Sequence, residues 1–337
     1  MPLAHCRYRF PDFRSGIRSG LPIRKSRSSW FLSRQILSPL VLLCLAYAGC
    51  LDRNPASSRN SFRASTEKIV YTDGIGNRIE VPRHPQRIIS LAPNITETLY
   101  LLGAQDRLIG NTTQCSWPEA AKRVLKIGDL LNPNYEVILA ARPDLVIAST
   151  AGNDRSAVMK LSGMGIPVYV AAPRSVERIL QSVEDIGRIT DCAAQGVRLA
   201  AQMKNRLAAV ERRIAGLPPV RAFFITWFDP LLTPGKTTFE TDVLRLAGVI
   251  SITGDIPQFY PRYSLEQLLV KDPDVILTIE HEGDPLPDFG KTPGWRDLRA
   301  VRQGRIYFLS EYLQHPSPLF VDGVEDLAKK LYPERFQ

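Results

Sequence analysis

Short apolar runs alternate with amphipathic stretches along the chain from about residue 67 onward. The apolar runs are rich in β-branched and aliphatic side chains, which indicates strands, at residues 88–91, 145–149, 168–170, 222–227, 275–279 and 305–309. Two further runs, 69–72 and 78–81, flank a Gly- and Asn-containing turn and predict a β-hairpin. Strands that alternate with helices form parallel βαβ units, so the pattern predicts an α/β fold.

The middle of the chain follows a helical pattern instead. Residues 175–188 read as one helix, and a second extends to about residue 214 with apolar side chains on one face, at Met203, Leu207, Val210 and Ile214. Gly216 and the prolines after it end this helix. Twenty-odd helical residues span about 35 Å. We therefore expect two Rossmann-like lobes, each a mainly parallel sheet with flanking helices, joined by a single long rigid helix. The expected boundaries are 67–174, 175–216 and 217–337.

Two helix starts are predicted from capping residues. Asn94 with Glu97 three positions later fits a capping box, and this helix should end at Gly103. Asp191 is suited to cap the long helix of the middle segment.

An internal repeat links the two predicted lobes. Residues 134–147 resemble residues 264–277 at a constant offset of 130, and both copies place an acid, Glu136 and Glu266, in the first turn of a short helix before a Pro-Asp turn and a strand. Acidic side chains favour helix N-termini by about 0.3–1 kcal/mol. That preference explains each glutamate separately, but not their matching positions.

Charge is concentrated at the N-terminus. The chain of 337 residues has a formal net charge of +9, but residues 1–49 carry eight basic residues and one acidic residue, and residues 51–66 carry three and one. The remaining residues hold 32 of each sign. The folded body is thus neutral, which argues against nucleic-acid binding.

The N-terminal segment has the pattern of an export signal. An uncharged stretch, 35–51, follows the basic region, and its apolar core is too short to span a bilayer comfortably. We predict a signal peptide over residues 1–49 and a polar, flexible tether over 50–66; an uncleaved signal anchor is the alternative. The ending Ala48-Gly49-Cys50 resembles the lipobox of bacterial lipoproteins. That resemblance implies lipidation of Cys50 and anchoring to a membrane of the cell envelope.

Motifs for other chemistry are weak. Gly235-Lys236-Thr237 lacks the first glycine of a phosphate-binding loop, because Pro230 stands in its place. No nucleophile elbow or credible catalytic triad is found, so no enzyme activity is predicted. His281 and His315 with a glutamate would be needed for a bare Zn or Mn site, and their spacing does not support one. Whether Cys115 and Cys192 form a disulfide stays open.

Aromatic and polar side chains gather where the predicted strands end. They occur at residues 92–94, 114–117, 129–130, 227–228, 260–263 and Tyr312. The carboxyl ends of parallel strands are where α/β folds bind ligands. Aromatic faces with polar edges suit a flat, amphipathic ligand.

The chain resembles the substrate-binding proteins of bacterial ABC importers for cobalamin, ferric siderophores and haem. The resemblance rests on residues 87–97 (RIISLAPNITE), 142–147 (RPDLVI), 165–168 (GIPV) and 272–276 (DPDVI), and it covers about residues 87–336. Residues 109–110 with 117–120 (WPEA), and 229–236 (DPLLTPGK), are most similar to the cobalamin-binding branch.

The resemblance implies a monomeric receptor that holds a metal chelate between its lobes, with no metal site, catalytic residue or cofactor of its own. Its ligand-binding residues would be Pro93, Asn94, Gln114, Trp117, Trp227, Tyr260 and Arg262. Glu136 and Glu266 would dock against arginines of a membrane permease, which works with ATPase subunits.

Cobalamin or another corrinoid is the expected ligand. Gln114 and Leu130, however, stand where cobalamin receptors often carry Tyr and Trp, so a siderophore or haem remains the alternative, with Arg174 or Arg262 meeting an anionic chelate. A receptor for bare Zn or Mn, and an exported enzyme on the same scaffold, are less favoured hypotheses.

Overall fold

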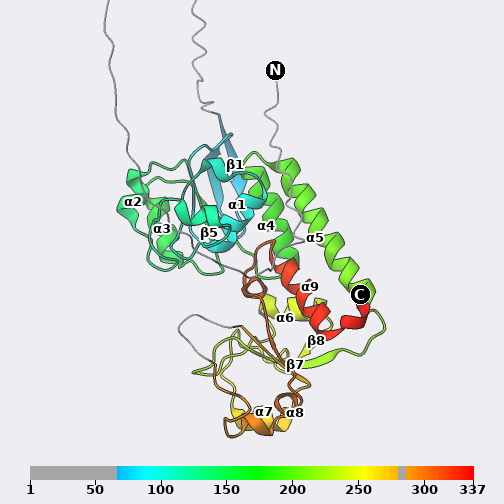
Figure 1. The fold of residues 1–337 in the computed structure, drawn as a ribbon. Coiled ribbons are helices and arrows are strands. Elements are labelled where there is room, and N and C mark those ends of the chain that lie inside the picture. The colour runs from blue at the N-terminus through cyan, green and yellow to red at the C-terminus, as the bar shows by residue number, and fades with distance from the viewer. Residues whose placement is uncertain (1–66, 280–285) are drawn as a thin grey trace, which may run out of the picture. The chain divides into compact units, whose positions relative to one another are not determined.

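The computed structural model describes residues 67–279 and 286–337, which belong to one compact unit (Figure 1). The predicted signal peptide, Cys50 and the tether lie outside these residues, as does His281. Among the described helices, none combines the length and the apolar composition that crossing a membrane requires.

The predicted hairpin is present at the start of the described part. Strands β1 (Lys68–Thr72) and β2 (Arg78–Pro82) pair antiparallel. The Asp73 carboxylate accepts the backbone N–H groups of Ile75 and Asn77 and closes the turn. The N–H of Gly74 donates to the carbonyl of Val170, so the hairpin tip is attached to the first sheet.

The first sheet contains four parallel strands in the order β4-β3-β5-β6. Their bounds are β3 (Ile88–Ser90), β4 (Leu108–Gly110), β5 (Leu145–Ser149) and β6 (Val168–Ala171). Helices α1 (Pro93–Leu101), α2 (Tyr135–Ala140) and α3 (Arg155–Gly163) belong to the same lobe. The residue patterns predicted β3, β5 and β6 but missed β4.

The second sheet repeats this design in the order β10-β9-β7-β8, again all parallel. Its strands are β7 (Val220–Ile225), β8 (Val249–Ser251), β9 (Val275–Thr278) and β10 (Ile306–Phe308). Its helices are α6 (Phe239–Leu246), α7 (Leu265–Lys271), α8 (Arg299–Arg302) and α9 (Phe320–Leu331). Short 3₁₀ helices are η1 (Gln105–Arg107), η2 (Glu119–Arg123), η3 (Trp295–Asp297), η4 (Glu311–Gln314) and η5 (Pro333–Arg335).

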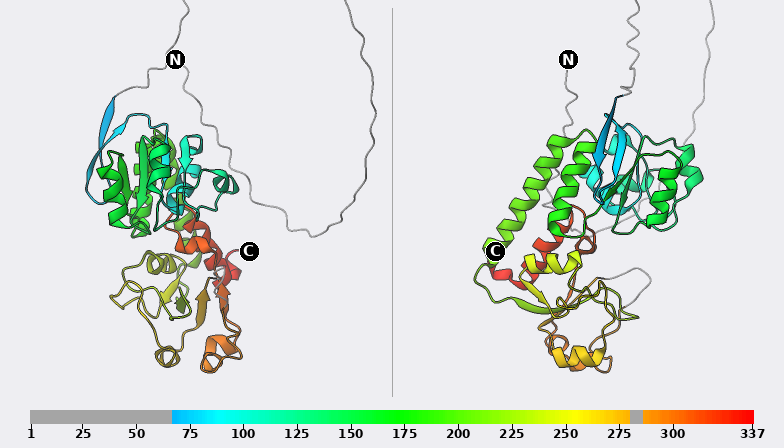
Figure 2. Two further views of the ribbon diagram at one scale, coloured as in Figure 1. Left: turned by 90° about the vertical axis from the view of Figure 1, so that its left-hand side faces the viewer. Right: turned by 180° about the vertical axis from the view of Figure 1, so that it is seen from behind.

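Helices α4 (Val176–Ile189) and α5 (Ala193–Ile214) lie side by side along one side of the first lobe, and α5 runs on toward the second lobe (Figures 1 and 2). They approach closely because each contributes a glycine at the contact: a Cβ on Gly187 would lie 3.0 Å from Cα of Gly196. The long helix is present as predicted, with Met203, Leu207 and Val210 buried.

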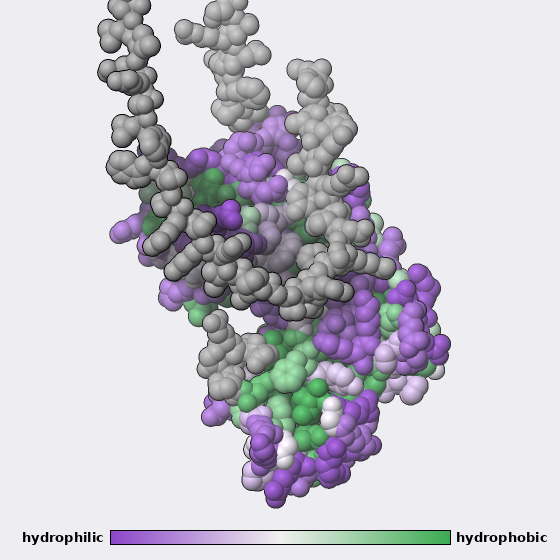
Figure 3. Space-filling view, in the orientation of Figure 1, coloured by the Kyte–Doolittle hydropathy of each residue, from purple (hydrophilic) through white to green (hydrophobic). Residues whose placement is uncertain are grey.

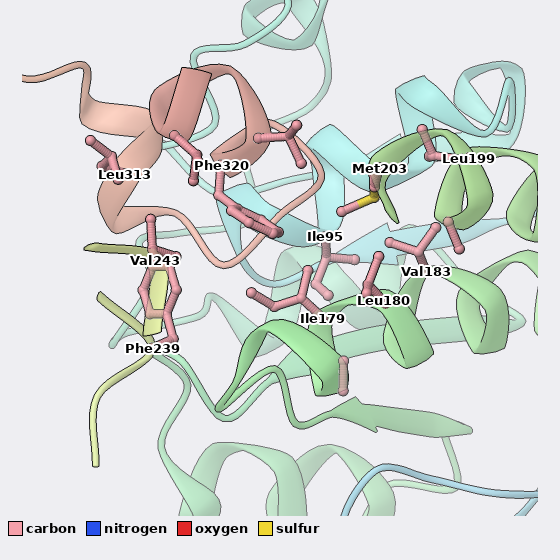
Figure 4. Close-up of a cluster of buried hydrophobic side chains, with 14 of the residues drawn as sticks. Ile95, Ile179, Leu180, Val183, Leu199, Met203, Phe239, Val243, Leu313 and Phe320 are labelled. Atoms are coloured by element: carbon pink, nitrogen blue, oxygen red, sulfur yellow. The ribbon is translucent and has the colours of Figure 1, made fainter. Parts of the chain in front are cut away.

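The lobes share one apolar core, so the connection is broader than the predicted single helix. Figure 4 shows side chains of α1, α4 and α5 meeting those of α6, η4 and α9, including Ile95, Met203 and Phe320. Arg206 of α5 also pairs with Asp322 and Glu325 of α9. Close packing of this kind resists relative movement of the lobes.

The predicted caps of α1 and α5 are wrong. Helix α1 begins at Pro93 with Ala92 as its N-cap, and Asn94 and Glu97 are buried within it. Proline at the first helical position sets the start without a side-chain cap. Asp191 has a left-handed backbone (φ 55°) and bonds His84, while Cys192 occupies the N-cap of α5, where its side chain does not cap the helix.

The two cysteines of the folded body do not form a disulfide with each other. The Cys115 sulfur contacts the hydroxyls of Thr96 and Thr112, at 3.2 Å each, and the Cys192 sulfur accepts a bond from Arg107 at 3.2 Å. Both thiols are buried in the first lobe.

Candidate functional site

The loops that follow the carboxyl ends of the two sheets meet each other. Asn94, in α1 directly after β3, donates to the hydroxyl of Ser149 (3.1 Å) and to the carbonyl of Pro316 (3.4 Å), which follows β10 and η4. Three residues later, the Glu97 carboxylate bonds Nδ1 of His315 at 3.0 Å. Segments that follow strands of the two sheets are therefore in contact with each other at this point.

On the first lobe, the loop after β4 carries two predicted ligand residues. Gln114 is exposed, and its Oε1 accepts the N–H of Leu130 (3.0 Å), which ties two loops of this edge together. Trp117 is half-buried and precedes a cis bond to Pro118. Leu130 is half-buried and its neighbour Leu131 is 65% exposed, so aliphatic surface lies beside Gln114.

Lys126 holds this loop in place, a role that the sequence patterns did not reveal. Its ammonium donates to Oδ1 of Asn111 (2.8 Å) and to the carbonyls of Thr112 (3.2 Å), Ala121 (3.1 Å) and Cys115 (3.4 Å). Burial lowers the pKa of Lys126. One ammonium thus gathers four oxygens from both ends of the segment that presents Gln114 and Trp117.

On the second lobe, three aromatic side chains are exposed beyond β7 and β8. Trp227 is 41% exposed, Phe259 54% and Tyr260 36%. The indole N–H of Trp227 donates to the carbonyl of Asp229, and the rings of Phe259 and Tyr260 pack edge to face with centroids 4.8 Å apart. Figure 3 shows apolar surface (green) on this lobe. Phe259 is an aromatic that the sequence reasoning missed.

A buried carboxylate supports Tyr260 from behind. The phenolic hydroxyl donates to Oε1 of Glu240 at 2.6 Å, and Glu240 is only 3% exposed. Burial raises the pKa of Glu240 to about 7, although the hydrogen bond from Tyr260 works in the opposite direction. Burial, together with the charge of Glu240, also raises the pKa of Tyr260.

The Gly-Lys segment after β7 holds the aromatic loop. The N–H of Gly235 donates to the carbonyl of Phe259 (3.0 Å), and that of Lys236 to the carbonyl of Ile256 (2.8 Å). A Cβ on Gly235 would lie 1.9 Å from the carbonyl oxygen of Gln258, so only glycine permits this approach. These two amides, which a phosphate-binding loop would need, are already bonded to backbone oxygens.

The structure places the predicted ligand residues in segments that follow strands of both sheets. Gln114 and Trp117 are accessible on the first lobe, together with half-buried Pro93, and Trp227, Tyr260 and exposed Arg262 are accessible on the second. Asn94 is buried, and its side chain is bonded within the bridge between the lobes. Its role in ligand binding remains a prediction, as do the roles of the other six.

Other concave or polar features lie elsewhere. A shallow cavity of about 520 Å³ borders β8 and includes Arg221, Arg245 and Lys271, but none of the predicted ligand residues lines it. Among residues 67–279 and 286–337, no group of three or more His, Cys, Asp or Glu side chains is arranged to hold a metal ion. His315, considered for such a site, bonds Glu97 instead.

The repeated glutamates lie on matching short helices. Glu136 and Glu266 are each the second residue of α2 and α7, and both are exposed. Asn134 and Ser264 cap these helices by accepting the N–H groups of Val137 (3.1 Å) and Gln267 (3.2 Å). The helices lie near opposite ends of the two-lobed body (Figure 1). Bonds from its own N–H and from Ser264 lower the pKa of Glu266.

The sequence and the two-sheet architecture of this chain both have counterparts among known proteins. The model of the family described as periplasmic binding protein matches residues 88–313. The chain belongs to this family. A sequence relative is the uncharacterized ABC transporter substrate-binding lipoprotein YvrC of Bacillus subtilis, 29% identical over 90% of this chain and 98% of the relative.

Two solved structures show the same architecture. The periplasmic vitamin B12 binding protein BtuF of Vibrio cholerae is 29% identical, with a TM-score of 0.66 over 75% of this chain and 99% of that protein. The periplasmic heme-binding protein RhuT of Roseiflexus sp. RS-1 is 26% identical, with a TM-score of 0.66 over 74% and 99%. The family and the two-lobed fold predicted from the sequence are confirmed, and the family is one of binding proteins.

Proposed function

We propose that this chain is the substrate-binding component of an ABC importer, which captures a metal chelate between its two lobes and delivers it to a permease with ATPase subunits. The observation that supports the proposal is the exposure of the aromatic side chains Trp227, Phe259 and Tyr260 in the loops that follow strands β7 and β8 of the second sheet. Soluble domains seldom leave large apolar side chains grouped in this way unless they bind something. A flat chelate would cover these rings while its polar rim meets Gln114 and Arg262.

A corrinoid is the first candidate for the chelate. The sequence motifs most similar to cobalamin receptors and the likeness to the vitamin B12 binding protein of Vibrio cholerae both support it. Haem or a ferric siderophore is the second candidate, favoured by the aliphatic Leu130 and Leu131 beside Gln114 and by the likeness to the heme-binding protein RhuT.

Titration distinguishes these candidates. The purified protein is titrated with cyanocobalamin, haemin and a ferric siderophore, and binding is followed by quenching of tryptophan fluorescence and by calorimetry. We expect cyanocobalamin to bind at least about tenfold more tightly than the others, a difference of about 1.4 kcal/mol. Tighter binding of haemin or the siderophore would select the second candidate. Binding of Zn²⁺ or Mn²⁺ without any response to the chelates would refute chelate capture.

A matched pair of tryptophan variants locates the site. Trp227→Ala removes an exposed ring from the loop after β7 and should weaken chelate binding about tenfold. Trp295→Phe alters a buried ring packed against Phe289 and should leave the affinity nearly unchanged. Equal effects of the two substitutions would place the ligand elsewhere.

Docking is proposed to use Glu136 and Glu266. Both carboxylates are exposed near opposite ends of the body, where ion pairs with permease arginines would fix its orientation. Glu136→Arg with Glu266→Arg should leave chelate affinity unchanged and abolish uptake. Glu177→Arg is the control, since this glutamate also lies in the first turn of a helix, α4, but outside the repeat. Uptake by the double variant would refute docking through these residues.

The protein is further proposed to be a lipoprotein of the cell envelope, anchored through Cys50. The lipobox-like ending of the N-terminal segment supports this proposal, as does the description of the relative YvrC as a lipoprotein. Labelling of cells with radioactive palmitate should mark the protein, and Cys50→Ser should abolish the label. Cys44→Ser, six residues earlier, is the control and should retain it. A label on the Cys50→Ser variant would show that lipid is attached elsewhere.

A further inference from the structure

The two helices that carry the repeated glutamates are each held at their C-terminal end by an arginine from the first strand region of their lobe. In the first lobe, the Arg87 guanidinium donates to the carbonyls of Ala141 (2.6 Å from Nη2, 3.2 Å from Nε) and Arg142 (3.0 Å), which follow α2. The backbone N–H of Arg87 donates to the Asp144 carboxylate at 2.9 Å. Side chain and backbone of one residue therefore join β3, the end of α2 and the start of β5.

The second lobe has a similar arrangement, although there Arg299 also donates to the Asp272 carbonyl, at 3.3 Å. The Arg221 guanidinium donates to the carbonyls of Lys271 (2.8 Å) and Asp272 (3.4 Å) at the end of α7, and its backbone N–H donates to the Asp274 carboxylate at 3.0 Å. Lys271, Asp272 and Asp274 each stand 130 residues after their counterparts in the first lobe. The arginines themselves are 134 residues apart, so the constant offset that revealed the glutamates did not reveal them.

The backbone confirms that the two helix ends are equivalent. Arg142 and Asp272 both adopt a left-handed conformation, with φ of 45° and 37°, although neither is a glycine. Such a conformation costs roughly 1–2 kcal/mol for residues with a Cβ and persists only where surrounding contacts hold it. The arginine forks supply contacts to the carbonyls on both sides of this turn.

Short helices need such support. Helix α2 has six residues and α7 has seven, and helices of this length are unstable on their own. The N-terminal ends are capped by Asn134 and Ser264, so without an anchor at the other end the helix would still fray from its C-terminus. Fraying would change the direction in which the glutamate of the first turn points.

We propose that Arg87 and Arg221 are positioning residues for permease docking: they clamp the C-terminal carbonyls of α2 and α7 and thereby hold Glu136 and Glu266 at a fixed separation and direction. This inference rests on the proposed docking function. The docking surface predicted from the sequence contained only the acidic residues Glu136 and Glu266, and this inference adds two basic residues to it. Neither arginine touches the predicted ligand residues, so the clamp acts on delivery and not on capture.

The test uses Arg87→Met and Arg221→Met, which keep side-chain length and remove the donors. Affinity for the cognate permease complex in nanodiscs should fall about threefold to tenfold for each variant, as expected for lost charged hydrogen bonds at a partly exposed site. Affinity for cyanocobalamin should not change. Arg87→Lys, which still reaches a carbonyl, should recover part of the docking. Arg83→Met is the control, because this exposed arginine bonds Glu67 and not a helix end.

Two measurements separate positioning from a general structural effect. In a double-mutant cycle, Arg87→Met should cause no further loss of docking in a Glu136→Ala background, because the arginine acts through the glutamate. Amide hydrogen exchange should accelerate over residues 137–142 in Arg87→Met and over 267–272 in Arg221→Met, with the rest of the lobe unchanged. Unchanged exchange, or additive losses in the cycle, would overturn the clamp.

The outcome also distinguishes failure of the inference from failure of the proposed docking. If Glu136→Ala and Glu266→Ala reduce docking while the arginine variants do not, the docking function stands and the clamp is refuted. If the glutamate variants themselves dock normally, the docking surface lies elsewhere, and the positioning role falls with it.

Discussion

Replacing Glu97 with glutamine tests whether the contact that bridges the two lobes is ionic. Glu97 is 3% exposed, lies in α1 of the first lobe, and bonds Nδ1 of His315 in the second lobe at 3.0 Å. The substitution preserves the shape of the side chain and removes its charge. Because the pair is largely buried, we expect a charge-assisted hydrogen bond worth about 1.5–3 kcal/mol of unfolding free energy when His315 is protonated.

The sign of the pH dependence follows from the pKa of His315. Burial of the imidazole disfavours its charge, but the hydrogen bond and charge of Glu97, with a contribution from Glu311, outweigh burial and raise the pKa above its ordinary value of 6.5. The raised pKa adds stability that is complete below pH 6.5 and is lost as pH rises through the folded-state value. In the Glu97→Gln variant, burial still lowers the pKa of His315, and only the charge of Glu311 still raises it. The extra stability at low pH should therefore shrink or change sign.

Urea unfolding at pH 5.5 and 8.5 measures both effects. Glu97→Gln should be less stable than the unmodified protein by about 1.5–3 kcal/mol at pH 5.5, and the difference should shrink at pH 8.5. Titration of other groups, including Glu240, is common to both proteins and cancels from the comparison.

Asp191→Asn is the matched control, since it makes the same carboxylate-to-amide change opposite His84. That pair has side chains 48% and 56% exposed, so its loss should change stability by less than about 1 kcal/mol at either pH. Equal stability of Glu97→Gln and the unmodified protein at pH 5.5, or a difference that grows toward pH 8.5, would refute an ionic bridge.

Three further substitutions test the supports of the site. Lys126→Met removes the donor to Oδ1 of Asn111 and to the carbonyl of Cys115, and one of the donors to the carbonyls of Thr112 and Ala121. It should lower the unfolding free energy by about 2–3 kcal/mol in urea, whereas Lys122→Met, which breaks a surface pair, should change it by less than about 1 kcal/mol. Gly235→Ala forces the 256–260 loop to shift, so it should weaken chelate binding and lower the Tm by several degrees. Gly163→Ala, whose Cβ meets no atom within 4 Å, should do neither. The pKa of Glu240 is raised to about 7, so the contribution of this residue to the free energy of unfolding falls as pH rises from about 4.5 to 7. In urea unfolding, the Glu240→Gln variant should therefore be more stable than the unmodified protein above pH 7. Below pH 4.5 it should not be more stable.

Fold class could be predicted from the sequence because both sheets are built from local, periodic patterns. The strands that were predicted lie in the buried middle of each sheet or beside it, where continuous apolar runs are required. Strands β4 and β8 were not predicted; within the described residues, each lies at an edge of its sheet and pairs with one strand only. The matching glutamates were visible because the repeat preserves spacing along α2 and α7.

The sequence also indicated which chain segments follow strand ends, and hence most of the candidate ligand residues. It did not indicate which of them are accessible. Asn94 and Glu97 had the spacing of a capping box, but the structure buries both and directs them across the lobe interface. Local spacing cannot distinguish these outcomes, because partners such as Pro316 lie more than 200 residues away.

The sequence by itself therefore determined the features that depend on short-range patterns. These are the α/β class, the long helix, the repeat and the neutral charge of the folded body. Only the tertiary structure decided the contacts between distant segments. These include the bridge of Glu97 and His315, the lysine that gathers the 111–121 loop, and the arginines that clamp two helix ends. The physical reason is that a polar side chain binds whichever complementary group folding brings within about 3 Å, and its sequence neighbours do not specify that group.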